Sequence, residues 1–405
     1  MGLSENLQKI MSYQRVYLNP KKEESLKRFH PWIFSGAIHH TDGTLEEGEI
    51  VEVYDSQHNY LATGHCQIGS IAIRILTFRQ EKIDFIFWKK RLETAFNLRK
   101  RLGLVNNPDN TVYRLIHGEG DNMPGLIVDI YGNTAVMQAH SPGMHIARHE
   151  LAAALKELPG NFIKNIYYKS EGTLPFKADL EAEDGYLYGG TDIPDFVVEN
   201  GLKFRVDWIK GQKTGFFVDQ RNNRELLEKY AENRKVLNLF CYTGGFSAYA
   251  MRGKAELVHS VDSSSKAIDL TRANIDLNFP DDNRHQAFSE DAFRYLEKTC
   301  QTYDLIVLDP PAFAKHRKVL RNALQGYKKL NALAFEKIQP QGIIFTFSCS
   351  QVVSKENFRL AVFSAAAQSN KNVKILHQLS QQPDHPINIY HPEGEYIKGM
   401  VLSVE

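Results

Sequence analysis

From residue 235 onwards, short apolar runs alternate with segments whose apolar residues recur at helical spacing. Strands separated by helices in this way are typical of a parallel sheet built from right-handed βαβ units. The last two apolar runs have no helical segment between them, so the pattern predicts a seven-stranded Rossmann-like sheet whose last strand is antiparallel. The expected strands are 235–242, 257–262, 285–291, 303–310, 342–350, 373–379 and 396–405. One expected helix begins at residue 245, and four more cover residues 263–278, 291–298, 323–337 and 354–368.

Two further regions precede this sheet. Residues 14–79 form short runs that alternate apolar and polar positions, as in GEIVEVYDSQHNYLATGHC and IAIRILTF, and they predict a small β-barrel. Residues 111–200 mix strand-like runs with one helix near 142–157, which indicates a central α+β unit. For a chain of 405 residues we therefore predict three domains, with limits at 12–80, 81–195 and 196–405.

The segment DFIFWKKRLETAFNLRKRL at 84–102 predicts one amphipathic helix. Its apolar stripe is surrounded by six basic side chains, which stand at 89–91 and 99–101. A charge run of this kind is usually a solvated face, and the alternative is a helix that faces phosphates. The sequence leaves both interpretations open.

Composition excludes several classes of protein. No apolar stretch approaches the roughly 20 residues of a membrane helix, and the amino terminus lacks the apolar core of a signal peptide, so we expect a cytoplasmic protein without a membrane partner. Cys66, Cys241, Cys300 and Cys349 stand far apart and form no CxxC pair, which argues against a metal site or a disulfide framework. The net charge of +1 means that any basic surface for a nucleic acid must be local.

Candidate cofactor residues follow the first three strands of the predicted sheet. The turn in NLFCYTGGFS is neither a GxGxxG fingerprint nor a P-loop, so it is not shaped for a pyrophosphate. Asp262 ends the second strand, where a carboxylate can accept both hydroxyls of a ribose, and Asp291 follows the third, where adenine is usually recognised. Each acidic residue alone is more often a helix N-cap than a ligand contact, but the three strand ends together favour S-adenosylmethionine over NAD. The candidate cofactor contacts are Asn238, Phe240, Gly244, Asp262, Ser263, Asp291, Ala292 and Asp309.

The fourth strand ends in LDPPAF, where two prolines fix a rigid loop directly after Asp309. An Asp/Asn-Pro-Pro sequence at this position is how many nucleobase methyltransferases build a wall for a base that is flipped out of its stack. A strand stop is the simpler interpretation of the loop. The neighbouring strand decides between the two, because it ends in Cys349.

Cys349 ends the fifth strand, directly beside the fourth, and can therefore face the same pocket as Asp309. Methylation of a pyrimidine at C5 needs a nucleophile that adds to C6, and a thiolate is both a good nucleophile and a good leaving group. We expect Cys349 to be that nucleophile, Asp309 to bond the base at N3 or N4, and Ser348 and Ser350 to favour the thiolate. No residue is assigned as the base that removes the C5 proton, because Lys315 and His316 are near in sequence only.

Several of these segments together resemble the bacterial and archaeal 23S rRNA 5-methylcytosine methyltransferases that carry an N-terminal PUA domain. The segments are HPWIFSGAI, GQKTGFFVDQRNNR, NLFCYTGGFS, LDPPAF, TFSCS, DHP and YHPEGEYIKG. The resemblance implies a PUA barrel, a central α+β domain, a catalytic domain and a homodimer. It also implies that Gln220 and Arg221 line the cofactor pocket, and that the small β-domain and the basic helix bind RNA, either 23S rRNA or its precursor. Another class of RNA 5-methylcytosine enzymes has a second cysteine where this chain has Ala312, so Cys349 would act without it.

The leading hypothesis is an S-adenosylmethionine-dependent methyltransferase that acts on cytosine C5 in rRNA through Cys349. An enzyme that methylates guanine, or uracil at C5, is the first alternative; related guanine enzymes share the DPP loop but lack the serine-flanked cysteine, so Cys349 would be idle. A non-catalytic RNA-binding assembly factor is the second alternative. Intact Asp262, Asp291, Asp309 and Cys349 argue against it.

Overall fold

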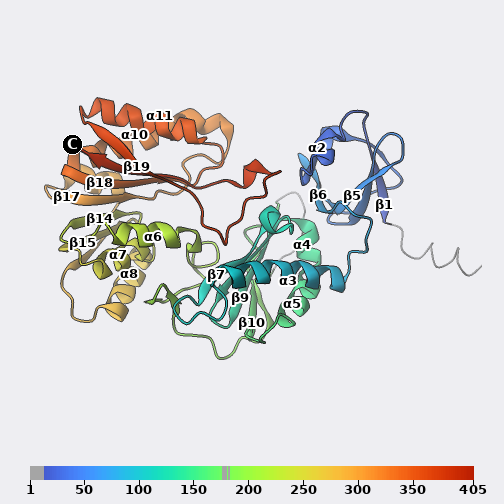
Figure 1. Cartoon of the computed structure of the whole chain (residues 1–405), viewed down its shortest axis with the longest axis horizontal. Helices are drawn as coiled ribbons and strands as arrows, with labels where there is room; N and C mark the ends of the chain where they lie inside the picture. Colours follow the sequence, from blue (N-terminus) through green and yellow to red (C-terminus); the bar gives the residue numbers. More distant parts are fainter. Residues whose placement is uncertain (1–12, 176–179, 181–182) are drawn as a thin grey trace, which may run out of the picture.

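Three large sheets follow one another along the chain (Figure 1). The structure is a computed structural model, and it describes residues 13–175, 180 and 183–405. The sheets cover residues 14–77, 112–188 and 235–404, in the order of the three predicted domains. Of the helices in these described ranges, none is both long enough and apolar enough to cross a membrane.

The first domain is a six-stranded sheet of order β2-β6-β5-β4-β1-β3. Its elements are β1 (Gln14–Leu18), α2 (Glu24–Lys27), β2 (Trp32–Phe34), β3 (Ile38–Thr41), β4 (Ile50–Tyr54), β5 (Tyr60–Cys66) and β6 (Ile71–Thr77). Val51 and Val53 in β4 and Ile73 in β6 have no exposed surface and belong to the hydrophobic core of this domain. The alternation of apolar and polar residues therefore predicts this part of the chain correctly.

The central domain is a five-stranded sheet of order β11-β10-β9-β8-β7, with three helices packed against it. Its elements are α3 (Phe85–Arg101), β7 (Val112–His117), β8 (Leu126–Tyr131), β9 (Thr134–Ala139), α4 (Pro142–Ile146), α5 (Arg148–Lys156), β10 (Asn165–Tyr168) and β11 (Gly185–Tyr188). The single helix expected at 142–157 is divided at Ala147, so that prediction is corrected to two short helices.

The basic helix α3 begins at Asp84, whose carboxylate accepts hydrogen bonds from the amides of Ile86 and Phe87. Its basic residues do not form one phosphate-facing surface. Arg99 has no exposed surface and makes two hydrogen bonds to the carboxylate of Asp121, at 2.5 and 2.8 Å. Arg91 donates to the carbonyl oxygen of Leu76. Only the exposed side chains at 90, 100 and 101 stay available to a phosphate.

The third domain contains a seven-stranded sheet of order β16-β15-β14-β17-β18-β20-β19, in which β20 is antiparallel to both neighbours. This confirms the Rossmann-like methyltransferase sheet. Its strands are β14 (Lys235–Leu239), β15 (Leu257–Asp262), β16 (His285–Ser289), β17 (Tyr303–Leu308), β18 (Ile338–Ser348), β19 (Val373–Leu379) and β20 (Lys398–Val404). Its helices are α6 (Arg221–Glu228), α7 (Gly245–Arg252), α8 (Ser265–Asn278), α9 (Ala292–Lys298), α10 (Leu320–Lys337) and α11 (Lys355–Gln368). A short hairpin, β12 (Val197–Glu199) and β13 (Leu202–Phe204), precedes them.

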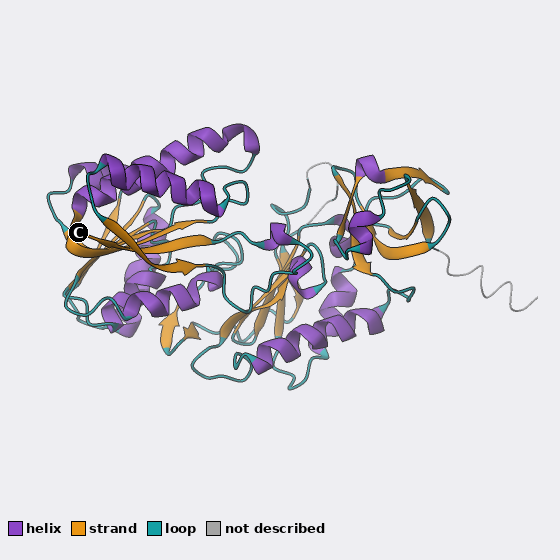
Figure 2. Cartoon of the chain, turned by 45° about the horizontal axis from the view of Figure 1, so that its top comes forward, coloured by secondary structure: helices purple, strands orange, loops and turns teal. Residues whose placement is uncertain are grey.

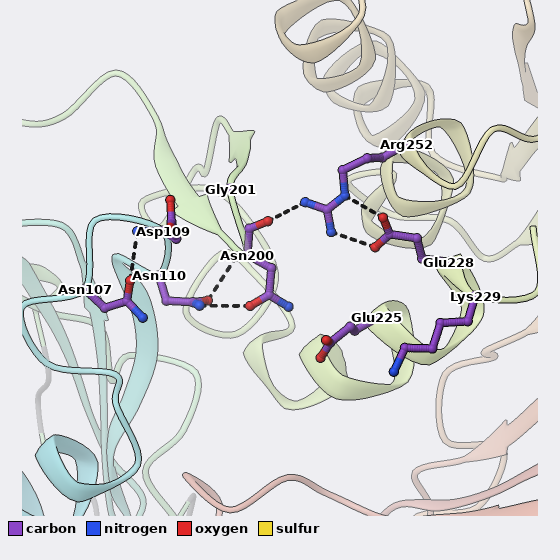
Figure 3. A pocket seen from close by; sticks show the side chains of 9 residues that line it. All are labelled: Asn107, Asp109, Asn110, Asn200, Gly201, Glu225, Glu228, Lys229 and Arg252. Atoms are coloured by element: carbon purple, nitrogen blue, oxygen red, sulfur yellow. Dashed lines mark hydrogen bonds and ion pairs between the residues drawn. The ribbon is translucent and has the colours of Figure 1, made fainter.

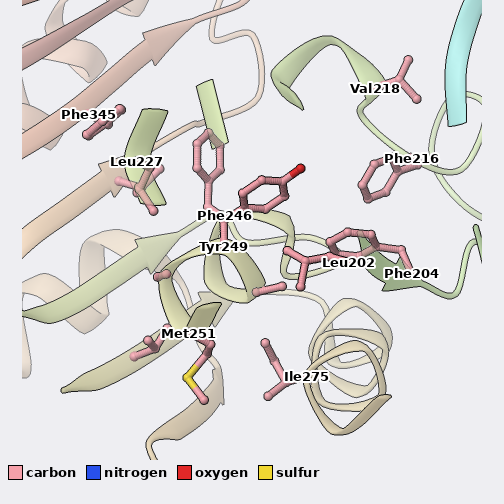
Figure 4. Packing of buried hydrophobic residues seen from close by; sticks show 14 of the residues in the cluster. Leu202, Phe204, Phe216, Val218, Leu227, Phe246, Tyr249, Met251, Ile275 and Phe345 are labelled. Carbon is pink, nitrogen blue, oxygen red and sulfur yellow. The ribbon is translucent and has the colours of Figure 1, made fainter. Parts of the chain in front are cut away.

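Helices cover both faces of this sheet, as Figure 2 shows. Alternate residues of β17 point into two separate cores: Leu305 and Val307 into the one formed with α6 and α7, and Ile306 and Leu308 into the one formed with α10 and α11. Figure 4 shows the first core, where aromatic side chains of α7 pack between the sheet and the β12–β13 hairpin. Because both faces are buried at the centre of the sheet, residues 305–308 of β17 and 343–347 of β18 are nearly continuous apolar runs.

Buried ion pairs and hydrogen bonds join the central domain to the catalytic domain. Arg221 in α6 pairs with Asp384 at 3.1 Å and donates to the carbonyl oxygen of Val112 in β7. Asp384 also accepts from the amide of Arg114 at 3.1 Å, and its own carbonyl oxygen accepts from Arg99. Three segments far apart in sequence are therefore fixed to one another at a single carboxylate.

The long loop between β19 and β20 reaches the first domain, as the dark red segment in Figure 1 shows. The ring centroids of His391 in this loop and Trp32 in β2 lie 4.2 Å apart. The Trp32 indole donates to Glu119 of the central domain at 2.7 Å, and Arg74 of β6 pairs with the same carboxylate at 2.9 Å. All three domains therefore meet beside this loop.

Candidate active site

Adjacent strand ends bring Cys349 and Asp309 together. In the parallel pairing of β17 and β18, Leu308 lies opposite Thr346, so the residues that follow both strands share one edge of the sheet. The Sγ atom of Cys349 lies 3.8 Å from the carbonyl oxygen of Pro310, within the rigid loop that follows Asp309. The two predicted catalytic side chains thus lie beside the same loop.

The two serines beside Cys349 do not face its thiol. The Ser348 hydroxyl donates to the phenol oxygen of Tyr327 in α10 at 2.9 Å, and the Ser350 hydroxyl donates to the carbonyl oxygen of Ala314 at 2.6 Å. Both serines are buried. The expectation that they stabilise a thiolate is wrong; instead, they fix the end of β18 to its neighbours.

The carboxyl group of Asp309 lies in an environment that disfavours its charged form. Burial, followed by repulsion from Asp219, raises the pKa of Asp309 to about 7, although Gln220 donates to its Oδ2 atom at 3.1 Å. Asp219 belongs to the short 3-10 turn η4 (Val218–Gln220) and accepts a hydrogen bond from Tyr396 at 2.6 Å. Near neutral pH, Asp309 can therefore both hold and release a proton.

Cys349 is a thiol in the resting protein. Burial, followed by the carboxylates of Asp309 and Asp219, raises the pKa of this thiol to about 12, whereas the nearby Lys398 lowers it. A negative charge on Sγ is thus opposed by two carboxylates and favoured by one ammonium group. The charge of the pocket has to change before the thiolate forms in quantity.

The turn after β14 has an unusual backbone. Phe240 and Tyr242 have left-handed φ angles of 58° and 46°, and Gly244 has a φ of 78°. A Cβ atom on Gly244 would lie 2.7 Å from the Cγ2 atom of Thr271. The close packing of α8 is therefore enough to require a glycine at this position, even without a ligand. The α7 helix begins directly after this turn, and no side chain caps its amino terminus.

The predicted acidic residues lie at the ends of β15 and β16. Each oxygen of Asp262 accepts one backbone amide, from Tyr242 at 3.0 Å and from Ser264 at 2.9 Å, and each retains a second acceptor position. Asp291 caps α9 by accepting from the amide of Arg294, as a helix N-cap does. Ser263 beside Asp262 is exposed.

The remaining predicted cofactor residues divide into two groups. Phe240 is partly buried against the core on the α10 side, and Gln220 reaches Asp309. In contrast, the side chains of Asn238, Arg221 and Ala292 are buried. Asn238 donates to Ser247 at 2.9 Å, and Arg221 binds across the domain junction as described above.

Sequence reasoning missed Asp219 and Lys398 as members of this pocket. They lie within the segments VDQ and YIKG, on η4 and β20, and neither stands at a strand end that the βαβ pattern marks. The proximity of the YIKG segment to Cys349 follows only from the antiparallel pairing of β18 and β20, which sets Ser348 opposite Lys398. The described residues hold no cluster of three His, Cys, Asp or Glu side chains that could bind a metal ion.

A separate hollow of about 750 Å³ lies away from these strand ends, between α6 and the β12–β13 hairpin (Figure 3). Its polar side chains largely bind one another: Arg252 is bidentate to Glu228, and Asn110 donates to Asn200 at 2.8 Å. Because neither Cys349 nor Asp309 lines it, the hollow belongs to the domain junction.

Comparison with known protein families gives the class of the chain. A family model described as S-adenosylmethionine-dependent methyltransferase matches residues 182–389, and a PUA-like domain model matches residues 16–78. The fold agrees with a Streptococcus mutans protein described as a SAM-dependent methyltransferase, which superposes with a TM-score of 0.82 at 23% identity and covers 97% of this chain and 100% of that one. A methyltransferase structure in complex with SAH superposes equally well, at 24% identity. The class is thus an S-adenosylmethionine-dependent methyltransferase with an N-terminal PUA-like domain.

Curated relatives narrow this class. The ribosomal RNA large subunit methyltransferase I of Tolumonas auensis is 40% identical over 394 residues, which cover 96% of this chain and 98% of the relative. The protein of the same name from Aeromonas hydrophila is 39% identical with the same coverage. The chain belongs to this family of PUA-containing, S-adenosylmethionine-dependent methyltransferases. The resemblance found in the sequence is thereby confirmed for the family, the fold and the cofactor.

Proposed function

We propose that the protein methylates C5 of a cytosine in 23S rRNA, with Cys349 as the nucleophile. The observation that carries this proposal is the meeting of Cys349 and Asp309 beside one rigid loop. An exocyclic nitrogen attacks a methyl group directly and needs no thiol, so a cysteine in this position favours C5 chemistry. The names of the relatives favour the RNA of the large ribosomal subunit as the substrate.

The state of Asp309 supports cytosine over uracil. With a pKa of about 7, the carboxyl group is partly protonated at neutral pH and can donate a hydrogen bond to N3 of cytosine, which is an acceptor. In uracil, N3 carries a hydrogen, so two hydrogen-bond donors would face each other. The shift in the pKa of Asp309 therefore matches the base that we propose.

The chain's own residues account for the bond to C6 and for the proton on N3. The Cys349 thiolate adds to C6 while Asp309 gives its proton to N3, and this makes C5 nucleophilic. S-adenosylmethionine supplies the electrophilic methyl group when it is bound. After methyl transfer water takes the C5 proton, the C6–Sγ bond breaks and returns the thiolate, and the proton on N3 returns to Asp309.

The strand ends of β14, β15 and β16 fit the cofactor. We propose that the turn at Gly244 and the uncapped start of α7 contact its amino-acid part, and that the free acceptor positions of Asp262 bind the ribose hydroxyls. Asp291 and the backbone of Ala292 would border the adenine. Gln220 joins this region to Asp309 through its side-chain amide.

The other domains fit an RNA substrate. We propose that the PUA-like domain and the exposed basic residues at 90, 100 and 101 bind unpaired RNA around the target base. An rRNA substrate also supports the prediction of a cytoplasmic location. A homodimer stays a prediction from the family resemblance.

The test is methyl transfer from labelled S-adenosylmethionine to rRNA from a strain that lacks the protein, followed by nucleoside mass spectrometry. We expect wild-type protein to form 5-methylcytidine and Cys349→Ala to lose at least about a thousandfold in rate. Cys300→Ala is the matched control, because Cys300 is an exposed free cysteine. Full activity of folded Cys349→Ala, or a product other than 5-methylcytidine, would contradict the proposal.

A further inference from the structure

A buried lysine without an ion-pair partner lies beside the nucleophile. Lys398 is only 5% exposed, and its Nζ atom donates to the carbonyl oxygen of Ser350, the residue after Cys349, at 2.6 Å. Within the described residues, no carboxylate lies within ion-pair distance of this ammonium group. A buried charge normally has a counter-charge, because desolvation is costly. The lysine therefore needs an explanation beyond packing.

The charged groups around Lys398 and Cys349 are few. Asp309 from the end of β17 and Asp219 from η4 face Cys349 and oppose its negative charge. Glu395 and Lys355 influence Lys398, but they pair with each other at 2.5 Å. Among the charged groups that influence the thiol most strongly in the described part of the chain, Lys398 is the cation, and it lies on the strand next to β18.

A purely structural role for Lys398 is insufficient. The segment after Cys349 is already fixed by the Ser350 hydroxyl, which donates to Ala314. Any neutral donor could bond the Ser350 carbonyl oxygen as well. A positive charge is needed there only if a negative charge appears during the reaction.

We infer that Lys398 is a positioning residue that holds Ser350 and provides the counter-charge for the Cys349 thiolate. The inference rests on the proposed role of Cys349 as the nucleophile. When the thiolate forms, the S–H bond breaks and the proton passes to water, while Lys398 keeps its three protons. The thiolate and the ammonium group then form a neutral pair within the pocket.

The experiment measures the reactivity of the thiol directly, without RNA or cofactor. Full-length protein is alkylated with iodoacetamide between pH 6 and pH 10, and the Cys349 and Cys300 peptides are quantified by mass spectrometry. We expect Lys398→Met and Lys398→Gln to slow alkylation of Cys349 about tenfold at pH 8, which corresponds to a pKa about one unit higher. Lys398→Arg should stay within about threefold of wild type. Alkylation of the exposed Cys300 should be unchanged in all of them.

Two controls keep the result decisive. Lys398→Gln retains a donor for Ser350, so it preserves the fold if Lys398→Met does not, and thermal unfolding and S-adenosylmethionine binding verify each variant. Equal alkylation of Cys349 in wild type and in a folded neutral variant overturns the inference, as does a tenfold loss in Lys398→Arg. Suppose that the alkylation result contradicts the role of Lys398. If Cys349→Ala has lost methyl transfer, only this inference has failed; if Cys349→Ala is active, the proposed function has failed as well.

Discussion

Buried charges gather in two parts of the molecule, and they are paired in one part and uncompensated in the other. The first part, which we call the paired cluster, comprises Arg99–Asp121, Arg114–Asp129, Arg221–Asp384 and Arg224–Glu199, with distances between 2.5 and 3.1 Å. The second, the pocket cluster, comprises Asp219, Asp309, Cys349 and Lys398, where two carboxylates oppose the charge of the thiol and the lysine lacks an ion pair.

The difference separates the requirements of folding from those of chemistry. A bidentate arginine–carboxylate pair lowers the cost of burying both charges, so the paired cluster can hold domains together. In the pocket cluster, a proton or a thiolate has to appear and disappear within one turnover. A carboxylate that is already paired with a cation would resist those changes. Asp309 has a pKa of about 7 because it is buried beside Asp219.

The largest expected effect comes from breaking the paired cluster at Glu199→Gln. Glu199 accepts two hydrogen bonds from Arg224 at 2.8 and 2.6 Å and a third from Tyr249 at 3.0 Å, all of them buried. Loss of the negative charge leaves the Arg224 guanidinium buried and unpaired, which should destabilise the fold by about 3–5 kcal/mol in urea unfolding.

The matched control for this variant is the exposed pair Lys254–Glu232, whose side chains are 78% and 62% exposed. Glu232→Gln should change the free energy of unfolding by less than about 1 kcal/mol. Equal losses in the two variants would show that the buried pair is not the source of stability.

The pocket cluster should respond in the opposite way to Asp309→Asn. The change removes a buried carboxylate that is repelled by Asp219, so we expect stability at pH 7 to be equal or higher. Methyl transfer should fall about a hundredfold, because the amide cannot exchange a proton with N3 of the base. Single-turnover rates together with urea unfolding measure both quantities, and a variant that is both unstable and active would refute the division between the clusters.

The sequence predicts the arrangement of Asp309 and Cys349 because strand order determines it. Each follows an apolar run, and two parallel neighbouring strands must end at the same edge. The directions of the Ser348 and Ser350 hydroxyls could not be predicted in the same way. They depend on Tyr327 and Ala314, which lie on α10 and in the loop after the prolines.

Charge was the least predictable property. Arg99 stands in a basic run that is typical of an exposed helix face. In the structure it is buried and pairs with Asp121, 22 residues further along the chain. Asp219 and Lys398 have no fixed spacing from Cys349, because they reach it through a 3-10 turn and an antiparallel strand. Periodicity records which face is buried, but it does not record which charges meet there.

The sharpest comparison between the two clusters is the pH dependence of stability in Asp384→Asn and Asp309→Asn. Burial alone would raise the pKa of Asp384, but the neighbouring His385, which hydrogen-bonds its carboxylate, and the Arg221 guanidinium lower it. Its stabilising charge is therefore present above the ordinary aspartate pKa of about 3.9 and is lost as the pH falls below it. The advantage of wild type over Asp384→Asn should shrink as the pH falls from 6 to 3.

Asp309 has the opposite sign. Its folded pKa of about 7 lies above the unfolded value, so the folded protein binds the proton more tightly between pH 4 and pH 7. Stability of wild type relative to Asp309→Asn should therefore fall as the pH rises through this range, by on the order of 1 kcal/mol for each pH unit. Urea midpoints of the three proteins at pH 3, 4, 5.5 and 7 measure both slopes. Slopes of the same sign would mean that Asp309 is as well compensated as Asp384, and the pocket would then lack the uncompensated charge that the chemistry requires.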